Sequence, residues 1–167
     1  ITIGQIGTTA AALDDAIQVG GRNLLKDTKA EVRNTNYPLK NYYLGSVKPQ
    51  EGEQVTIMFR GALGTGKTRF GLYNSGGTIS IVSIYDTDKG ADGIYRKTFN
   101  WKISTASNTF LALFHIPDSV TAESWVAEVM LVIGNKVAYY SEAPEDVQED
   151  YATKLGYSSY ATLVAKA

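Results

Sequence analysis

Apolar and polar residues alternate over most of the chain, and this alternation limits the fold more than any other feature. In "VTIMF", the alternate residues Val55, Ile57 and Phe59 share one face. In "YRKTFNWKI" and "SWVAEVMLVI", the same spacing gathers apolar residues on one side, which predicts half-buried β-strands. The two faces consist of Tyr95, Lys97, Phe99, Trp101 and Ile103, and of Trp125, Ala127, Val129, Leu131 and Ile133.

Two further runs, "TISIVSIY" and "TFLALFHI", are apolar on both faces, as expected of central strands that are covered on two sides. Clusters such as "NSGG", "DTDKGADG" and "IGNK" separate the runs and have the composition of turns. The span from Lys29 to Tyr140 holds about eight short strands with no helical segment between them. We therefore predict a mainly β fold, an antiparallel β-sandwich.

The first twenty residues have a helical spacing instead. The apolar residues Ile3, Ile6, Ala10, Leu13 and Ile17 form a heptad seam before two glycines end the segment. This predicts an N-terminal helix with two alternative roles. It is either the end of a longer coiled-coil stalk or a helix packed against its own domain.

A second helical segment follows the strands. Pro144, with acidic residues behind it, is typical of a helix start, and Gly156 is typical of a helix end. Ser158 or Ser159 can cap a last helix. We therefore divide the chain into an N-terminal helix (residues 1–20), a β-sandwich domain (21–143) and a C-terminal helical segment (144–167).

The stretch "GALGTGKT", from Gly61 to Thr68, matches the nucleotide-binding P-loop pattern at every position. A working P-loop needs a helix after the glycine turn, and "RFGLYNSGG" does not favour one. The sequence therefore favours a hairpin loop that joins Val55–Arg60 to Lys67–Tyr73. It also predicts that Phe70–Asn74 pairs with Ile79–Tyr85.

Few residues suggest catalysis or metal binding. Asp86, Asp88 and Asp92 alternate in one turn, where they form either a solvated acidic turn or a structural Ca²⁺ site. His115 lies in an apolar run, which favours a structural role, and the chain contains no cysteine. We find no pattern of catalytic residues, so we expect no enzymatic activity and, apart from that calcium ion, no cofactor.

The composition limits the classes of partner that the protein is expected to bind. The net charge of −1 indicates no general affinity for nucleic acid, and no apolar run is long enough to insert into a membrane. The chain has 11 Tyr and 2 Trp, more rings than one sandwich core needs on its inner face. Such rings can stack on sugars while neighbouring polar side chains bind the hydroxyl groups. The candidate ligand-binding residues are Tyr73, Tyr85, Tyr95, Trp101, Trp125, Arg69, Asn74 and Asn100.

Two stretches at the ends of the strand region resemble one family. "GRNLLKDT" (Gly21 to Thr28) resembles the opening phrase of carbohydrate-binding-module-like jelly-roll domains in phage and prophage tail proteins. "VMLVIGNKVAYYSEAPED" (Val129 to Asp146) resembles the closing phrase of these domains, although Tyr140 stands where the family usually has Trp. The resemblance implies a jelly-roll fold, a place in the virion tail and a homotrimer formed through the N-terminal helix. It carries over no binding residue.

Together these features lead us to expect a non-catalytic module of a phage or prophage tail protein that attaches to host-surface glycan. The protein would be made in the bacterial cytoplasm and would lie outside the cell once assembled with other tail proteins. Two alternatives remain open. One is a purely structural spacer or protein-docking module of a tail fibre, and the other is an accessory carbohydrate-binding domain of a glycan-degrading enzyme.

Overall fold

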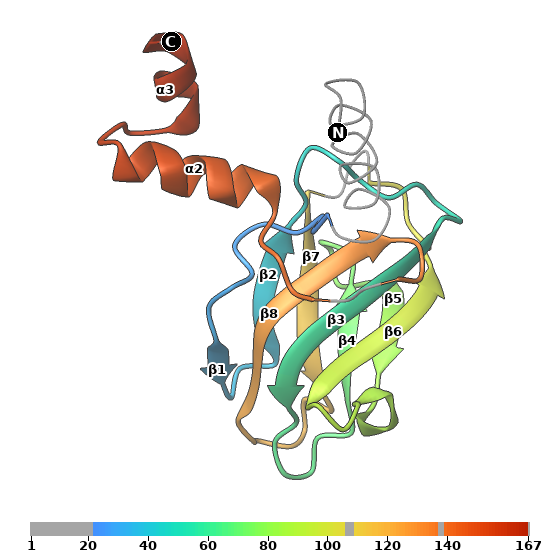
Figure 1. Ribbon diagram of the computed structural model, residues 1–167. Helices are drawn as coiled ribbons and strands as arrows, with labels where there is room; N and C mark the ends of the chain where they lie inside the picture. The colour runs from blue at the N-terminus through green and yellow to red at the C-terminus, as the bar shows by residue number, and fades with distance from the viewer. Residues whose placement is uncertain (1–21, 106–108, 137–138, 167) are drawn as a thin grey trace.

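The computed structural model describes residues 22–105, 109–136 and 139–166, which form a β-sandwich followed by two short helices (Figure 1). One antiparallel sheet has the strand order β1-β8-β3-β6 and the other has the order β2-β7-β4-β5. The strands are β1 (Val32–Asn34), β2 (Pro38–Tyr43), β3 (Gln54–Ala62), β4 (Arg69–Tyr73), β5 (Ser80–Ile84), β6 (Ile94–Asn100), β7 (Phe110–Ile116) and β8 (Ser124–Ile133). The predicted mainly β, antiparallel fold is confirmed, whereas the predicted N-terminal helix lies outside the described residues.

The core lies between the two sheets and includes the face predicted for β3. Val55, Ile57 and Phe59 are fully buried. The ring of Phe59 stacks on Tyr95 at 4.9 Å between centroids and meets the edge of Phe70 at 5.1 Å. Burial of this apolar surface is the main stabilising term, worth about 25 cal/mol per Å².

Strand β8 departs from the predicted alternation. Its register with β3 shifts between Met58 and Arg60, and Glu128 has a φ of 53°. This β-bulge adds a residue to β8, so the strand changes phase part of the way along its length. Val126, Val129 and Leu131 belong to the core, whereas Trp125 does not. The prediction that Trp125 and Ala127 share one face with Val129 is therefore wrong.

The connection between β3 and β4 also differs from the prediction. β3 pairs with β6 and β8, and β4 pairs with β5 and β7, so "GALGTGKT" crosses from one sheet to the other. The predicted hairpin between β3 and β4 is wrong, because local turn chemistry does not show which sheet the next strand joins. The predicted antiparallel pairing of β4 with β5 is confirmed.

The first and last described parts of the sandwich lie against each other. Leu24 and Leu25 are buried in the core, and the guanidinium group of Arg22 forms an ion pair with Glu145. The Oε1 atom of Glu145 also accepts hydrogen bonds from the backbone N–H (3.1 Å) and the hydroxyl (2.8 Å) of Ser46. Burial alone would raise the pKa of Glu145, but these hydrogen bonds and the Arg22 guanidinium lower it to about 2.

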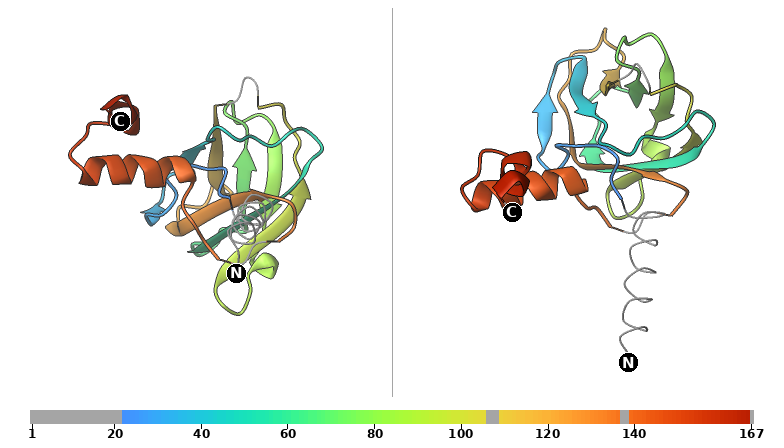
Figure 2. Two further views of the ribbon diagram at one scale, coloured as in Figure 1. Left: turned by 45° about the horizontal axis from the view of Figure 1, so that its top comes forward. Right: turned by 90° about the horizontal axis from the view of Figure 1, so that it is seen from above.

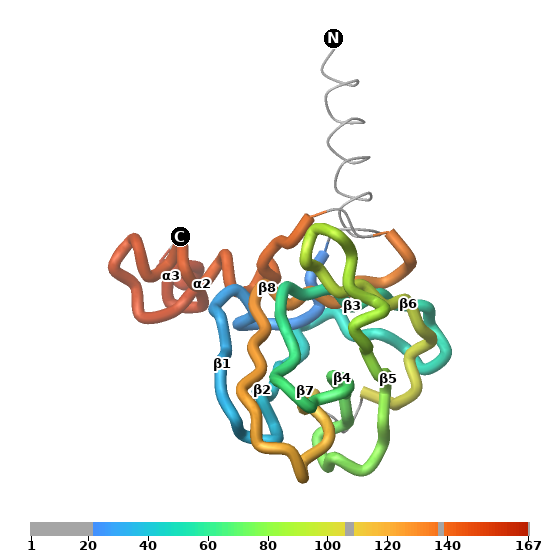
Figure 3. Tube along the Cα trace, turned by 90° about the horizontal axis from the view of Figure 1, so that it is seen from below, coloured from blue at the N-terminus to red at the C-terminus, as the bar shows by residue number. Residues whose placement is uncertain are grey.

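Two helices follow the last strand, β8, as predicted. α2 (Pro144–Lys154) begins with its proline, and Gly156, with a φ of 86°, follows its end. α3 (Tyr160–Lys166) is capped by Ser159, whose Oγ accepts the N–H of Thr162 at 3.1 Å. The two helices extend beside the sandwich and cover neither sheet (Figures 2 and 3).

Among the described residues, no helix is both long enough and apolar enough to cross a membrane.

Candidate functional site: an aromatic sheet face and its neighbouring hollow

Two of the candidate ligand-binding rings lie in the core. Tyr95 is fully buried, and its hydroxyl donates to Asp86 Oδ1 at 2.6 Å. Trp101 follows β6 and is 1% exposed. Both rings fill space between the sheets, so we leave them out of the candidate site.

The remaining candidates are spread over the surface. Tyr73 and Arg69 lie on the outer face of β4, whereas Trp125 lies on the outer face of the other sheet. Tyr85 and Asn100 are exposed at the ends of β5 and β6. Asn74 is almost buried, and its Oδ1 accepts the N–H groups of Thr78 and Ile79 at 2.8 and 2.9 Å. Its side chain therefore closes the β4–β5 turn.

The outer face of the β2-β7-β4-β5 sheet carries a group of rings that we call the aromatic face. On β7, Leu111 and Leu113 point into the core, while Phe110 and Phe114 are half-buried on the opposite side. Ring pairs then form across the sheet, with centroid distances of 4.7, 5.2 and 5.5 Å. The aromatic face consists of Tyr37, Tyr43, Tyr73, Phe110 and Phe114. The outer face of a two-layer sandwich is normally polar, so this group indicates an interaction surface.

Polar groups line both ends of the aromatic face. At one end, Arg69 Nη1 donates to Ser83 Oγ at 2.7 Å. At the other end, Tyr43 is 51% exposed and borders a hollow of about 490 Å³ between β2 and α2. We call this the Tyr43 hollow, and its lining includes Lys26, Asp27, Asn41, Tyr43, Asp146 and Glu149.

The acidic side of the Tyr43 hollow is held in place by backbone contacts. Asp27 has a φ of 54°, and its N–H donates to Asp146 Oδ2 at 2.8 Å. Burial raises the pKa of Asp146, and the nearby carboxylates of Glu142, Asp27 and Glu145 raise it further, while the N–H of Asp27 opposes them. The hollow therefore presents carboxylate, amide and ammonium groups around one exposed ring, which is the set of groups that hydroxyl-rich ligands require.

The three aspartates proposed for calcium do not gather around one point. Asp92 accepts hydrogen bonds from Arg96 and from the N–H of Ile94, and the Arg96 contact lowers its pKa. Asp86 accepts the Tyr95 hydroxyl, and Asp88 accepts the N–H of Tyr85 at 2.9 Å. Across residues 22–105, 109–136 and 139–166, no three metal-ligating side chains are grouped for an ion. The calcium alternative stays a prediction.

The glycine loop is built around protein groups. Lys67, which would contact phosphate in a P-loop, is 8% exposed, and its Nζ donates to the Pro117 carbonyl at 2.6 Å. After Thr68 the chain forms β4, so the helix terminus that would bind phosphate is missing there. Lys67 thus holds the β3–β4 connection against the β7–β8 connection.

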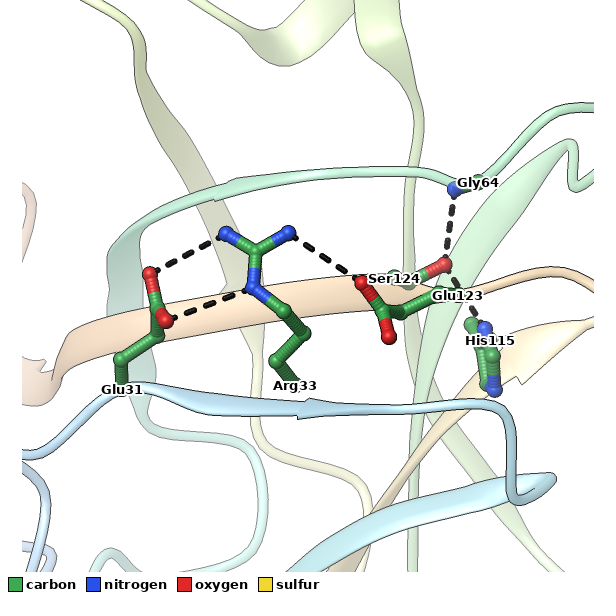
Figure 4. A network of polar contacts seen from close by, with 6 residues as sticks. All are labelled: Glu31, Arg33, Gly64, His115, Glu123 and Ser124. Atoms are coloured by element: carbon green, nitrogen blue, oxygen red, sulfur yellow. Dashed lines mark hydrogen bonds and ion pairs between the residues drawn. The ribbon is translucent and has the colours of Figure 1, made fainter.

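A buried Ser–His pair lies behind the same loop (Figure 4). His115 Nδ1 is 2.7 Å from Ser124 Oγ, and Ser124 Oγ accepts the N–H of Gly64 at 2.8 Å. His115 Nε2 is 2.5 Å from the Asn36 carbonyl. A neutral imidazole that carries its proton on Nε2 satisfies all these groups, because Nδ1 then accepts the serine hydroxyl. Both side chains are fully buried, so the pair joins the β1–β2 and β3–β4 loops to strands β7 and β8 inside the protein.

The buried histidine predicts a loss of stability in mild acid. Burial lowers the pKa of His115, and the positive charge of Lys67 lowers it further. The unfolded chain therefore binds a proton below about pH 6.5 while the folded state does not, so stability is full above pH 6.5 and falls as pH decreases towards the lowered folded pKa. Urea unfolding should show lower stability at pH 5.5 than at pH 7.5, by at most about 1.4 kcal/mol, the limit that the unfolded pKa sets.

A His115→Gln variant provides the control for this prediction, since His115 is the one histidine of the chain. The variant should be less stable at pH 7.5, and its stability should change little between the two pH values. An equal decrease in the variant would assign the effect to other groups.

The sequence indicated Tyr73 and Arg69 as ligand-binding candidates without assigning them to a face, and it did not predict Tyr37, Tyr43, Phe110, Phe114 or the Tyr43 hollow. A usable signal was present in "YY" at Tyr42 and Tyr43, because successive strand residues point to opposite faces and only one of two adjacent rings can enter the core. The acidic lining comes from Asp27 and from α2, more than 100 residues apart in sequence. No local pattern connects them.

Comparison of the chain with models of protein families, with curated proteins and with solved structures gives no match.

Proposed function

We propose that this protein is a non-catalytic, glycan-binding module of a phage or prophage tail protein and that it binds host-surface glycan along the aromatic face. The observation that carries the proposal is a row of partly exposed rings on the outer face of the β2-β7-β4-β5 sheet. Pyranose rings present C–H groups that pack on flat aromatic rings, and Arg69 and the Tyr43 hollow supply polar partners at the two ends. On β7, the residue of this face between Phe110 and Phe114 is the small Ala112, which leaves room for a chain of neutral sugars.

The tail-protein assignment rests on the two phrases that resemble phage tail domains, and each phrase has a physical role in this fold. In the first phrase, Asn23, Leu24 and Leu25 are buried. In the second phrase, Glu145 forms the ion pair with Arg22. The residues of the two phrases therefore bring the first and last parts of the sandwich together. This arrangement suits a fibre in which one module follows another along the chain.

The strand orders support the jelly-roll assignment. β1 and β2, β3 and β4, β5 and β6, and β7 and β8 lie in opposite sheets, while β4 and β5 are neighbours in one sheet. Eight antiparallel strands that alternate in this way across two sheets follow the double Greek-key pattern. Trimerisation through residues 1–20 is also part of the proposal, and repetition of weak sites by symmetry would increase overall affinity.

Ring substitutions test the glycan proposal. Tyr43→Ala and Tyr73→Ala should each weaken binding to host polysaccharide about fivefold, because each removes one stacking contact worth about 1 kcal/mol. Affinity electrophoresis with purified host polysaccharides measures the change. Tyr139→Ala is the matched control, because its ring is 87% exposed and lies outside the aromatic face. Equal retardation of all four proteins by the same polysaccharide would contradict the proposal.

The tail context has its own test. Immunogold labelling of phage or induced prophage particles with antibody against this module should mark the tail, and label on the capsid alone would contradict the assignment. Sedimentation of a chain with a longer N-terminal stalk should give three times the monomer mass.

A protein-docking module is the second candidate, and the C-terminal helices favour it. Val147, Tyr151 and Leu155 follow one another at helical spacing and are each more than half exposed. Such a stripe fits a partner surface. If no host glycan binds and Tyr151→Ala weakens assembly with neighbouring tail modules, the docking function is the better description.

A further inference from the structure

A second hollow lies on the opposite sheet from the aromatic face. It has a volume of about 660 Å³ and lies where the outer face of β8 meets the β3–β4 and β7–β8 loops. We call it the Trp125 hollow, and its lining includes Arg33, Gly64, Thr65, Thr121, Glu123 and Trp125. It shares no residue with the aromatic face or with the Tyr43 hollow.

The β-bulge of β8 gives this hollow its aromatic group. With Glu128 at a φ of 53°, the strand changes phase and Trp125 turns out of the core. A non-glycine residue in this conformation is strained, and such strain is concentrated at functional sites. Bulges beside binding sites commonly redirect one side chain in this way. Trp125 is therefore placed on the surface by a feature that lowers stability.

Charged side chains hold the indole ring in place. Arg33 lies directly opposite Trp125 in the β1–β8 register. The Cζ atoms of Arg33 and Arg60 are 5.4 and 5.9 Å from the ring centroid. Both guanidinium groups thus lie over the ring, and Trp125 also lines the hollow.

Contacts within the protein link the polar groups around the hollow (Figure 4). Arg33 contacts Glu31 at 3.3 Å and Glu123 at 3.4 Å, so one guanidinium joins two carboxylates. Behind the hollow, the Ser124 hydroxyl accepts the N–H of Gly64 and binds His115. These contacts orient both loops, and such preorganisation reduces the entropy lost on binding.

The charges around the hollow define the class of ligand. The carboxylates of Glu31, Glu123 and Glu128 outnumber the two guanidiniums that they contact, so an anion would meet net repulsion. Ion-paired carboxylate and guanidinium groups still offer acceptors and donors to hydroxyl groups, and the threonine hydroxyls add more. An aromatic ring beside such groups suits a sugar.

We infer that the Trp125 hollow is a second saccharide site, which takes one neutral, terminal sugar residue. The sugar places hydroxyl groups on Arg33 and Glu123 and its apolar C–H groups against the exposed part of Trp125. The inference does not depend on binding along the aromatic face, because the two sites lie on opposite sheets.

Intrinsic fluorescence tests the site, because the chain has two tryptophans and Trp101 is 1% exposed. The whole chain is titrated with the methyl glycosides of glucose, galactose and mannose, and with methyl glucuronide as the anionic comparison. At least one neutral glycoside should change the emission saturably, with a Kd of about 1 mM for a ligand of this size. The anionic glycoside should bind at least about tenfold more weakly.

Substituted variants test whether the fluorescence change arises at the Trp125 hollow. Trp125→Phe should remove the fluorescence change, and Glu123→Ala should weaken binding at least about tenfold while it leaves Trp125 emission as a reporter. Glu149→Gln, which replaces an acidic residue of the Tyr43 hollow, should leave the titration unchanged. Tyr73→Ala should also leave it unchanged, which separates this result from that of the aromatic face.

Three results would overturn the inference. The first is no saturable change with any neutral glycoside up to about 50 mM, well above the expected Kd. The second is a change that persists in full in Glu123→Ala. The third is tighter binding of the glucuronide, or saturable quenching by inorganic phosphate, either of which would mean that the hollow is an anion site.

Discussion

Asn23→Leu should lower the free energy of unfolding by about 3 kcal/mol or more, the largest effect that we expect from a single polar residue of this chain. Asn23 is fully buried, and its Oδ1 accepts the N–H groups of Leu25 and Leu131, both at 3.1 Å. Its Nδ2 lies 2.9 Å from the Val129 carbonyl and 3.1 Å from the Ser141 carbonyl. Leucine is similar in size but can satisfy none of these backbone groups, and each one left unpaired costs about 1–3 kcal/mol.

Urea unfolding followed by circular dichroism measures this change. Asn100→Leu is the matched control, because its side chain is exposed at the end of β6, and its stability should stay within about 0.5 kcal/mol of the parent protein. If both variants were equally stable, Asn23 would not be the link between the first described residues and β8. A large loss of stability in Asn23→Leu would also show why the stretch "GRNLLKDT" places an asparagine directly before two core leucines.

Gly64→Ala should lower the free energy of unfolding by about 2–3 kcal/mol. A Cβ atom at this position would lie 2.5 Å from the Glu123 carbonyl oxygen and 2.7 Å from the Ala122 Cβ. The first of these is backbone, so the loops must separate to relieve the overlap. Their separation would also break the hydrogen bond from Gly64 to Ser124, which connects to His115.

Gly76→Ala provides the control for Gly64, because a Cβ there meets nothing closer than 3.8 Å. Its stability should stay within about 0.5 kcal/mol of the parent protein. Equal effects of the two substitutions would show that the glycine loop is not closely packed. A saturable, Lys67-dependent response to ATP would contradict our account of the loop more directly.

Spacing predicted most of the secondary structure, because a strand that buries one face must alternate and a helix must repeat about every 3.6 residues. The run "SWVAEVMLVI" coincides with β8, and "TFLALFHI" contains β7. The proline and glycine signals around α2 were also correct, since both act on the backbone of their own neighbourhood. These features depend on residues that lie within one element.

Pairing and burial could not be predicted in the same way. The glycine stretch was expected to close a hairpin, yet β3 and β4 lie in different sheets. Trp125 was expected on the same face as Val129, but the bulge at Glu128 places the two residues on opposite faces of β8. Tyr95 and Trp101 were candidates for ligand contact, and both are core residues. In each case the outcome depends on a partner strand far away in the sequence.

The sequence by itself determined that the chain forms strands between about Lys29 and Tyr140, that helices follow Pro144, and that no helix follows Thr68, because dihedral preferences and side-chain periodicity act locally. Only the tertiary structure decided which sheet each strand joins, which rings fill the core, and which gather on the outer face of β2-β7-β4-β5. The reason is that burial depends on how whole strands pack across about 10 Å between two sheets, and one added residue in β8 is enough to exchange its faces.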